Sequence, residues 1–203
     1  MQIVCLDLEG VLVPEIWIEV ARRTGIRELS RTTRDEPDYD KLMRGRIGIL
    51  AQHGLRLKDI EQVIGEMAPL QGAAAFLDRL RARFQVVILS DTFYEFADPL
   101  MRQLGRPTIL CHRLVVAEDG FVRDYRLRMP DQKRAAVEAF RALNFTTIAA
   151  GDSYNDTAML GAAHAGFFFK PPPAIAEQFP HFPVTHSYAE LDTAIARAAR
   201  DAA

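Results

Sequence analysis

Four short apolar segments, each followed at once by polar or charged residues, constrain the fold of this chain more than any other feature. They are residues 3–6, 86–89, 147–150 and 167–169. Continuous apolar runs of this length are typical of strands that are buried on both faces of a parallel sheet. Beyond residue 72, apolar residues recur at helical spacing between these runs. The alternation predicts an α/β fold with a doubly wound, Rossmann-like parallel sheet at its core.

Several expected helices are also marked at their ends. Gly105 occupies the position of a helix C-terminal glycine, and Asp131 is a candidate cap for a helix that contains Ala136 and Leu143. Ser187 to Glu190 forms a capping-box pattern before the last helix. Residues 114–127 contain an Asp-Gly turn between two strand-like runs, which predicts a hairpin at the edge of the sheet.

Residues 14–71 interrupt the alternation directly after the first strand. Their apolar residues recur at helical spacing, and none of their segments has a convincing strand pattern. We therefore expect an all-helical cap at 14–71, inserted into an α/β core made of residues 1–13 and 72–203. The insert carries ten basic and ten acidic residues, so it is not an arm that binds nucleic acid.

Composition narrows the possible partners and surroundings. The chain has 203 residues and a net charge of −2, so no basic excess points to nucleic acid or to an anionic membrane. No apolar run approaches the roughly 20 residues of a membrane helix, and the N-terminus lacks the pattern of a signal peptide. Cys5 and Cys111 lie in apolar surroundings without CxxC spacing, which is typical of reduced thiols in a cytoplasmic protein.

Acids and hydroxyls follow three of the expected strands. Because the carboxyl ends of parallel strands meet at one edge of a sheet, we expect these side chains to share one crevice. They are Asp7, Glu9, Ser90, Asp91, Asp152 and Asp156. Crowded carboxylates repel one another, and proteins usually neutralise such a cluster with a hard cation such as Mg²⁺. The five histidines are scattered and have no HExxH spacing, which argues against a zinc hydrolase.

Phosphoryl transfer would use all of these groups. A carboxylate can attack phosphorus to form an acyl phosphate, while a cation and a lysine neutralise the phosphoryl oxygens. Glu9 lies two residues after Asp7, so both side chains would point to the same side if the chain stayed extended. Lys133 lies at the start of an expected helix, where its charge would reach the floor of the crevice.

Four ordered motifs of the chain resemble those of the haloacid dehalogenase-like phosphatases. They are Asp7-Leu8-Glu9-Gly10-Val11, Ser90 after an apolar strand, Lys133, and Gly151-Asp152-Ser153-Tyr154-Asn155-Asp156. The helical insert and the run Val13-Pro14-Glu15-Ile16-Trp17 resemble the phosphoserine phosphatase branch. Two positions differ from most of that branch: Glu9 replaces an aspartate, and Val11 replaces a small hydroxyl residue. The combination is most similar to bacterial enzymes that are both phosphoserine phosphatases and homoserine phosphotransferases.

The resemblance implies a role for each matching residue of the core. Asp7 would be the nucleophile and a metal ligand, and Asp152 a second ligand of Mg²⁺. Glu9 would be the general acid and base, with its backbone carbonyl on the same ion. Ser90, Lys133 and Asn155 would contact the phosphate or substrate, and Asp91 either joins them or caps a helix. Asp156 either supports the metal site or caps the helix beginning near it, and the sequence favours neither.

Two residues of the insert bear on the substrate. Glu15 resembles a glutamate that binds the ammonium group of phosphoserine, and Arg46 resembles the arginine that binds its carboxylate, although Arg44 is close enough to compete. The insert itself would act as a lid that controls the access of water to an aspartyl phosphate. Homoserine would then be a second acceptor beside water. A homodimer is left open, because no sequence feature sets the oligomeric state.

Two other functions use part of the same pattern. A phosphatase for another small phosphomonoester would keep Asp7 and Asp152 but would have no use for Glu15 and Arg46. A phospho-accepting signalling domain also combines an α/β core, an aspartate and Mg²⁺. Such a domain does not need the insert at 14–71, and it has little need for Glu9 as an acid, so we favour the enzyme.

Overall fold

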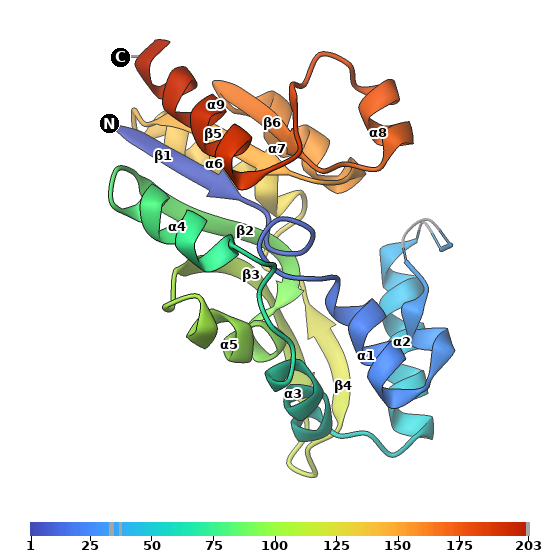
Figure 1. The fold of residues 1–203 in the computed structure, drawn as a ribbon. Helices are drawn as coiled ribbons and strands as arrows, with labels where there is room; N and C mark the ends of the chain where they lie inside the picture. Colours follow the sequence, from blue (N-terminus) through green and yellow to red (C-terminus); the bar gives the residue numbers. More distant parts are fainter. Residues whose placement is uncertain (33–34, 37, 202–203) are drawn as a thin grey trace.

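A seven-stranded sheet forms the centre of the computed structural model, which describes residues 1–32, 35–36 and 38–201 (Figure 1). The strand order is β4-β3-β2-β1-β5-β6-β7, and every pairing is parallel except that of β3 with β4. The strands are β1 (Gln2–Leu6), β2 (Gln85–Phe93), β3 (Thr108–Val116), β4 (Val122–Arg126), β5 (Thr146–Gly151), β6 (Ala165–Phe169) and β7 (Val184–Thr185). The predicted α/β class is confirmed.

Helices cover both faces of the sheet, because alternate residues of β1 enter different apolar clusters. Val4 and Leu6 pack on the side of α4 (Ala73–Arg81), α5 (Tyr94–Gln103) and α9 (Tyr188–Asp201). Ile3 and Cys5 pack on the side of α6 (Gln132–Ala142) and α7 (Thr157–Ala162). The short helix α8 (Pro173–Gln178) follows β6. This is the doubly wound arrangement that buried, uniformly apolar strands require.

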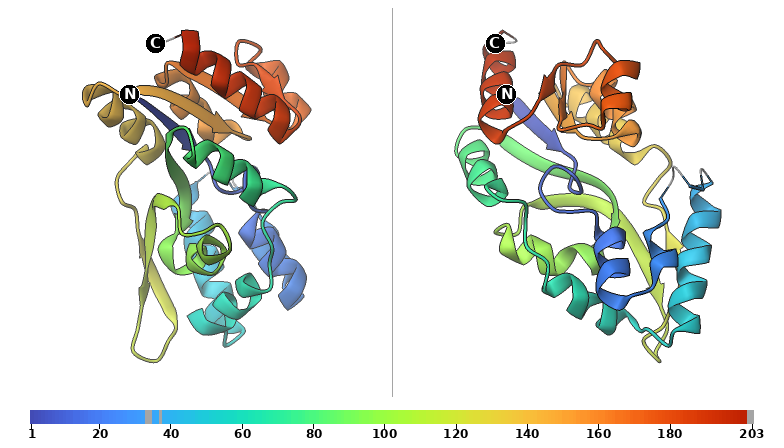
Figure 2. Two further views of the ribbon diagram at one scale, coloured as in Figure 1. Left: turned by 60° about the vertical axis from the view of Figure 1, so that its left-hand side comes forward. Right: turned by 45° about the vertical axis from the view of Figure 1, so that its right-hand side comes forward.

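The insert is helical throughout its described residues. It contains α1 (Ile16–Thr24), a 3₁₀ turn at Arg27–Ser30, α2 (Tyr39–Gln52) and α3 (Leu57–Gly65). Its apolar side chains, such as those of Ile16 and Met43, join the same core cluster as the α4–α5 side of the sheet. Figure 2 shows these helices beside the β3–β4 hairpin, and the Leu57 N–H donates to the carbonyl of Gly120 in that hairpin at 2.9 Å. The division of the chain at 14–71 stays a prediction.

Two strands differ from the sequence expectation. The hairpin lies at the sheet edge as predicted, but its first strand reaches back to Thr108 and pairs in parallel with β2. Strand β2 does not end at Leu89: it continues through Ser90 to Phe93, with a register irregularity against β3 between Leu89 and Phe93. A shift of this kind lets a strand carry polar residues without breaking the sheet.

Two of the three predicted helix ends are confirmed, and the third differs. Gly105 has a φ of +72° after α5, and Ser187 Oγ accepts the Glu190 N–H at 3.2 Å before α9. Asp131 precedes α6 but caps it with no side-chain hydrogen bond, because its backbone is left-handed and its carboxylate pairs with Arg134.

The remaining composition-based expectations concern the thiols and the membrane. Cys5 and Cys111 are both free and buried, and burial raises the pKa of each thiol to about 12. Within residues 1–32, 35–36 and 38–201, no helix combines the length and the apolar character needed to cross a bilayer.

Candidate active site

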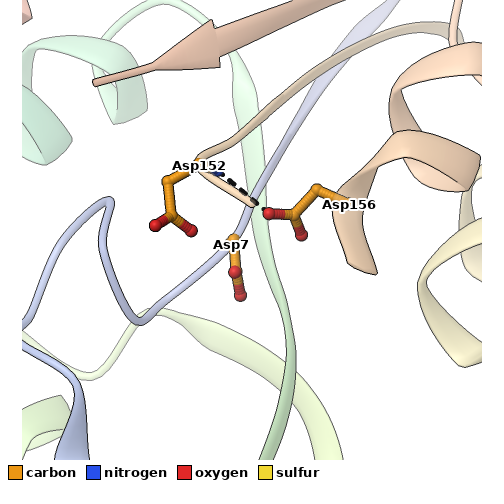
Figure 3. A group of neighbouring side chains, drawn as sticks. All are labelled: Asp7, Asp152 and Asp156. Carbon is orange, nitrogen blue, oxygen red and sulfur yellow. Dashed lines mark hydrogen bonds between the residues drawn. The ribbon is translucent and has the colours of Figure 1, made fainter. Parts of the chain in front are cut away.

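Three carboxylates meet at the carboxyl edge of the sheet (Figure 3). Asp7 directly follows β1, Asp152 directly follows β5, and Asp156 ends the short 3₁₀ turn η2 (Tyr154–Asp156). Each offers an oxygen that lies within 4.8 Å of the others. The Asp7 N–H donates to the carbonyl of Ala150 at 2.9 Å, so the position of Asp7 is set by the β1–β5 pairing. The sheet topology therefore brings these three carboxylates together at the sheet edge.

Lys133 lies in the first turn of α6 with its side chain buried beneath these acids. Its Nζ is 2.8 Å from Asp156 Oδ1, 3.0 Å from Asp7 Oδ1 and 3.5 Å from Asp91 Oδ2. Burial by itself would lower the pKa of Lys133, but the charges of Asp156, Asp7 and Asp91 raise it well above its usual value. The site therefore holds a permanent positive charge beside Asp7.

Asp156 supports the loop that carries Asp152. It is fully buried, and its Oδ2 accepts the backbone N–H groups of Asp152 and Ser153 at 2.9 and 3.1 Å. Its other oxygen accepts from Lys133. It also occupies the position before α7 but makes no side-chain cap there. Of the two readings that the sequence left open, the geometry favours the supporting role.

Asp152 lies against the backbone of Gly10. A Cβ placed on Gly10, which has a φ of +75°, would lie only 2.3 Å from the Asp152 carboxylate, so a side chain at this position would displace the acid. Burial, followed by the charge of Asp156, raises the pKa of Asp152 to about 7. Burial and Asp156 likewise raise the pKa of Asp7 well above its usual value, against the opposing effect of Lys133.

These acids fit a hard cation. Asp7 and Asp152 offer carboxylate oxygens whose ionised forms are disfavoured by burial and by the charge of Asp156, and a bound divalent ion would offset that penalty. Both oxygens of Asp156 are engaged by donors, so Asp7 and Asp152 are the better ligands. The structure therefore provides an acidic group that can hold a metal ion.

Glu9 is held by the start of the insert. The chain bends at Leu8 and turns through Gly10, so the segment from Asp7 to Glu9 is not extended, and the condition under which both side chains were expected on one side is not met. Glu9 Oε2 instead accepts the Ile16 N–H at the start of α1 at 2.8 Å. Burial, together with the charge and hydrogen bond of Glu15, raises the pKa of Glu9 to about 8. Glu9 thus joins the core to the insert.

Ser90 and Asp91 lie within β2 rather than in a turn. Ser90 is buried, and its Oγ accepts the Thr92 N–H at 3.3 Å, which leaves the hydroxyl proton available to an anion. Asp91 Oδ2 accepts from Asn155 Nδ2 at 3.0 Å, so this contact brings Asn155 to the group. Asp91 does not cap a helix, because α5 begins three residues later.

Arg46 is buried in the insert with weak partners. Its guanidinium donates to the carbonyl of Arg31 at 2.6 Å and lies 4.6 Å from the centre of the Trp17 ring. Its Nε finds no hydrogen-bond partner in the described part of the chain. Burial lowers the pKa of Arg46 to about 10, although Glu9 opposes that shift. Arg44, in contrast, is exposed and pairs with Asp40 at 2.8 Å, so the two arginines face different surroundings.

Three residues of this region were not identified from the sequence. Gln132 donates to the carbonyl of Ser90, His112 lies beside Asp91, and the Tyr39 hydroxyl donates to the Asp91 carbonyl at 3.2 Å. Of these three, only Gln132 could have been noticed in the sequence, because it directly precedes the motif residue Lys133. His112 comes from β3 and Tyr39 from the insert, and neither belongs to a motif.

Known proteins resemble the chain in sequence. A family model described as haloacid dehalogenase-like hydrolase matches residues 1–164. A protein named phosphoserine phosphatase ThrH, from Pseudomonas aeruginosa, is 59% identical over 94% of this chain and 93% of its own length. A phosphoserine phosphatase from Pseudomonas syringae pv. tomato is 60% identical over 94% of this chain and 81% of its own length.

Solved structures resemble it in fold. The crystal structure of phosphoserine phosphatase from T. onnurineus in complex with NDSB-201 has a TM-score of 0.72 at 26% identity, covering 94% of this chain and 92% of that one. A phospho-aspartyl intermediate analogue of phosphoserine phosphatase, with a TM-score of 0.73 at 20% identity over 90% and 91%, shares the fold. The family model over residues 1–164 and the two relatives at 59% and 60% identity show that the chain belongs to the haloacid dehalogenase-like hydrolase family.

Proposed function

We propose that this chain is a Mg²⁺-dependent phosphoserine phosphatase that acts through an aspartyl phosphate on Asp7. The observation that carries the proposal is the position of Asp7: its carboxylate lies 3.0 Å from the buried ammonium of Lys133, close to Asp152, at the carboxyl edge of the sheet. The relatives named phosphoserine phosphatase support the choice of substrate.

The reaction requires two displacements at phosphorus. Asp7 attacks, the bond between phosphorus and the seryl oxygen breaks, and Glu9 gives its proton to that oxygen. A water molecule then attacks the aspartyl phosphate and transfers a proton to Glu9, which returns Asp7 and Glu9 to their initial forms. The raised pKa of Glu9 suits the first role, because the acid holds a proton at neutral pH.

The phosphoryl oxygens need donors and positive charge. Lys133, the Ser90 hydroxyl and Asn155 supply them in this proposal, and the N-terminus of α6 adds its positive end. Asp7, Asp152 and the backbone carbonyl of Glu9 would hold Mg²⁺, which neutralises phosphoryl charge when it is bound.

The insert selects the amino-acid end of the substrate. Arg46 would bind the carboxylate, since a buried guanidinium with an unpartnered Nε is costly until an acceptor arrives. Glu15, at the start of α1, would bind the ammonium group. The same pocket would admit homoserine after serine leaves, so that the phosphoryl group passes to a second alcohol. The cytoplasmic location and a homodimer stay predictions.

Incubation with phosphoserine and Mg²⁺, with and without homoserine, tests the proposal. We expect free phosphate in both reactions, phosphohomoserine by ³¹P NMR in the second, and reversible loss of both products in chelator. Phosphate esters of a sugar and of a nucleoside serve as competitors of different chemistry. Equal rates on all esters would remove the amino-acid assignment, and a phosphoprotein stable for hours would indicate a signalling domain instead. Phosphate release without phosphohomoserine would restrict the protein to hydrolysis.

A further inference from the structure

Asp91 presents its carboxylate to donors from three elements. Its Oδ2 accepts from Asn155 at 3.0 Å and lies 3.5 Å from Lys133 Nζ. Its Oδ1 accepts from Gln132 Nε2 at 3.1 Å and lies 3.6 Å from His112 Nε2. Each of these four neighbours offers a proton, so an ionised carboxylate, which only accepts, satisfies them all, whereas an amide would not.

His112 has a defined orientation. The ring is buried in β3, and its Nδ1 accepts the backbone N–H of Arg128 at 3.1 Å. A nitrogen that accepts carries no proton, so the ring proton of neutral His112 lies on Nε2, the atom that faces Asp91. The Arg128 backbone thereby makes His112 a donor toward Asp91.

Gln132 is oriented in the same way. Its Oε1 accepts from the Arg128 guanidinium at 3.0 and 3.2 Å, so its amide nitrogen points to the other side. That nitrogen donates to the Ser90 carbonyl at 2.5 Å and to Asp91 Oδ1 at 3.1 Å. Gln132 is also buried, and connected polar groups of this kind hold one another in a single arrangement.

We propose that His112 and Gln132 are positioning residues for phosphoryl transfer. They hold Asp91 Oδ1 from the side of β3 and α6, which keeps Asp91 Oδ2 against Lys133 and Asn155. This inference rests on the proposed function, in which Lys133 and Asn155 contact the phosphoryl oxygens. Small displacements of such groups reduce transition-state stabilisation more than substrate binding, because the amino-acid end is bound elsewhere.

Two substitutions of His112 separate positioning from packing. The amide nitrogen of His112→Gln falls near the former Nε2 and keeps a donor toward Asp91, whereas His112→Asn reaches only the former Nδ1 and loses it. We expect His112→Asn to lower kcat for phosphoserine about tenfold with KM within roughly threefold of wild type, and His112→Gln to restore most of kcat. Gln132→Glu keeps the acceptor for Arg128 but removes the donor, so it should resemble His112→Asn.

His164→Asn is the matched control. His164 Nδ1 accepts the Thr147 N–H at 3.0 Å, as His112 accepts from Arg128, but it directly precedes β6, which lies on the other side of β1 in the sheet. We expect its kcat to be unchanged, and thermal unfolding of every variant reports folding.

The outcomes distinguish the inference from the function on which it rests. Equal kcat in wild type, His112→Asn and Gln132→Glu would overturn the inference alone. Equal losses in His112→Asn and His112→Gln, with equally lowered Tm, would assign His112 to packing and also overturn it. No phosphoserine turnover by the wild-type protein would overturn the proposed function, and this inference with it.

Discussion

The acidic edge of the core and Arg46 of the insert differ in how their buried charges are compensated. In the core, Lys133 contacts three carboxylates, and Asp156 receives two backbone N–H groups in addition. In the insert, Arg46 is equally hidden, but it forms no ion pair with any described residue and leaves Nε without a partner. The core compensates its buried charges within the fold, whereas the buried charge of Arg46 has no ion-pair partner among the described residues.

This difference indicates that the two regions suit different tasks, one the chemical step and the other the selection of the substrate. A buried charge with fixed partners keeps its geometry when no substrate is bound, which suits groups that must meet a developing transition state. A buried cation that has no ion-pair partner carries a desolvation cost. A substrate carboxylate that binds the cation offsets this cost, which suits selection among substrates. Under the proposed function, chemistry and selectivity lie on different parts of the chain and should respond separately to substitution.

Asp7→Asn should break the chemistry and leave the selection intact. The amide has nearly the same shape but is a poor nucleophile, so we expect kcat to fall on the order of 10⁴-fold or more. Equilibrium dialysis with phosphoserine should still detect binding, because Arg46 and Glu15 are unchanged. Substantial turnover by the variant, or failure to trap a phosphoaspartate in quenched wild-type samples, would contradict the covalent mechanism.

Arg46→Ala should have the reverse effect. Loss of a buried, charge-assisted contact costs about 2 kcal/mol or more, so kcat/KM for phosphoserine should fall roughly 30-fold, mainly through KM. For phosphoethanolamine, which lacks the carboxylate, the loss should be small. Arg44→Ala is the matched control, because Arg44 lies on the same helix but is exposed and paired with Asp40. Equal losses on both substrates would make Arg46 a structural residue of the insert.

The sequence predicted the core better than the insert for a physical reason. Asp7 and Asp152 follow apolar strands, and parallel pairing alone brings such positions together. The direction of Glu9 depended on a bend at Leu8 that alternation could not reveal. Arg46 and Arg44 are two residues apart on one helix, and only packing against Trp17 separates their environments.

The network behind Asp91 lay outside any local pattern. His112 and Gln132 reach Asp91 from β3 and α6, and β3 was expected only from Leu114 onward, beyond His112. Because β2 and β3 shift register beyond Leu89, the pairing of Phe93 with His112 cannot be counted from the strand starts. Contacts that depend on a bulge and on long-range pairing are set by the tertiary fold, so a single sequence does not disclose them.

Glu9 belongs to the core but contacts Ile16 and Glu15 of the insert, so its pKa reports the contact between the two regions. Its pKa is raised to about 8 by burial first and by Glu15 second, so it is protonated at neutral pH and loses its proton as the pH rises. The proton is needed by the leaving oxygen, so kcat/KM for phosphoserine should be level below pH 8 and fall about tenfold per pH unit above it. Glu9→Gln should be slower and should lack this descending limb. Glu15 lies in the insert, and its charge and hydrogen bond raise the pKa of Glu9, so Glu15→Gln should shift the descending limb toward lower pH. A wild-type profile that stays level to pH 9.5 would place the proton donor elsewhere.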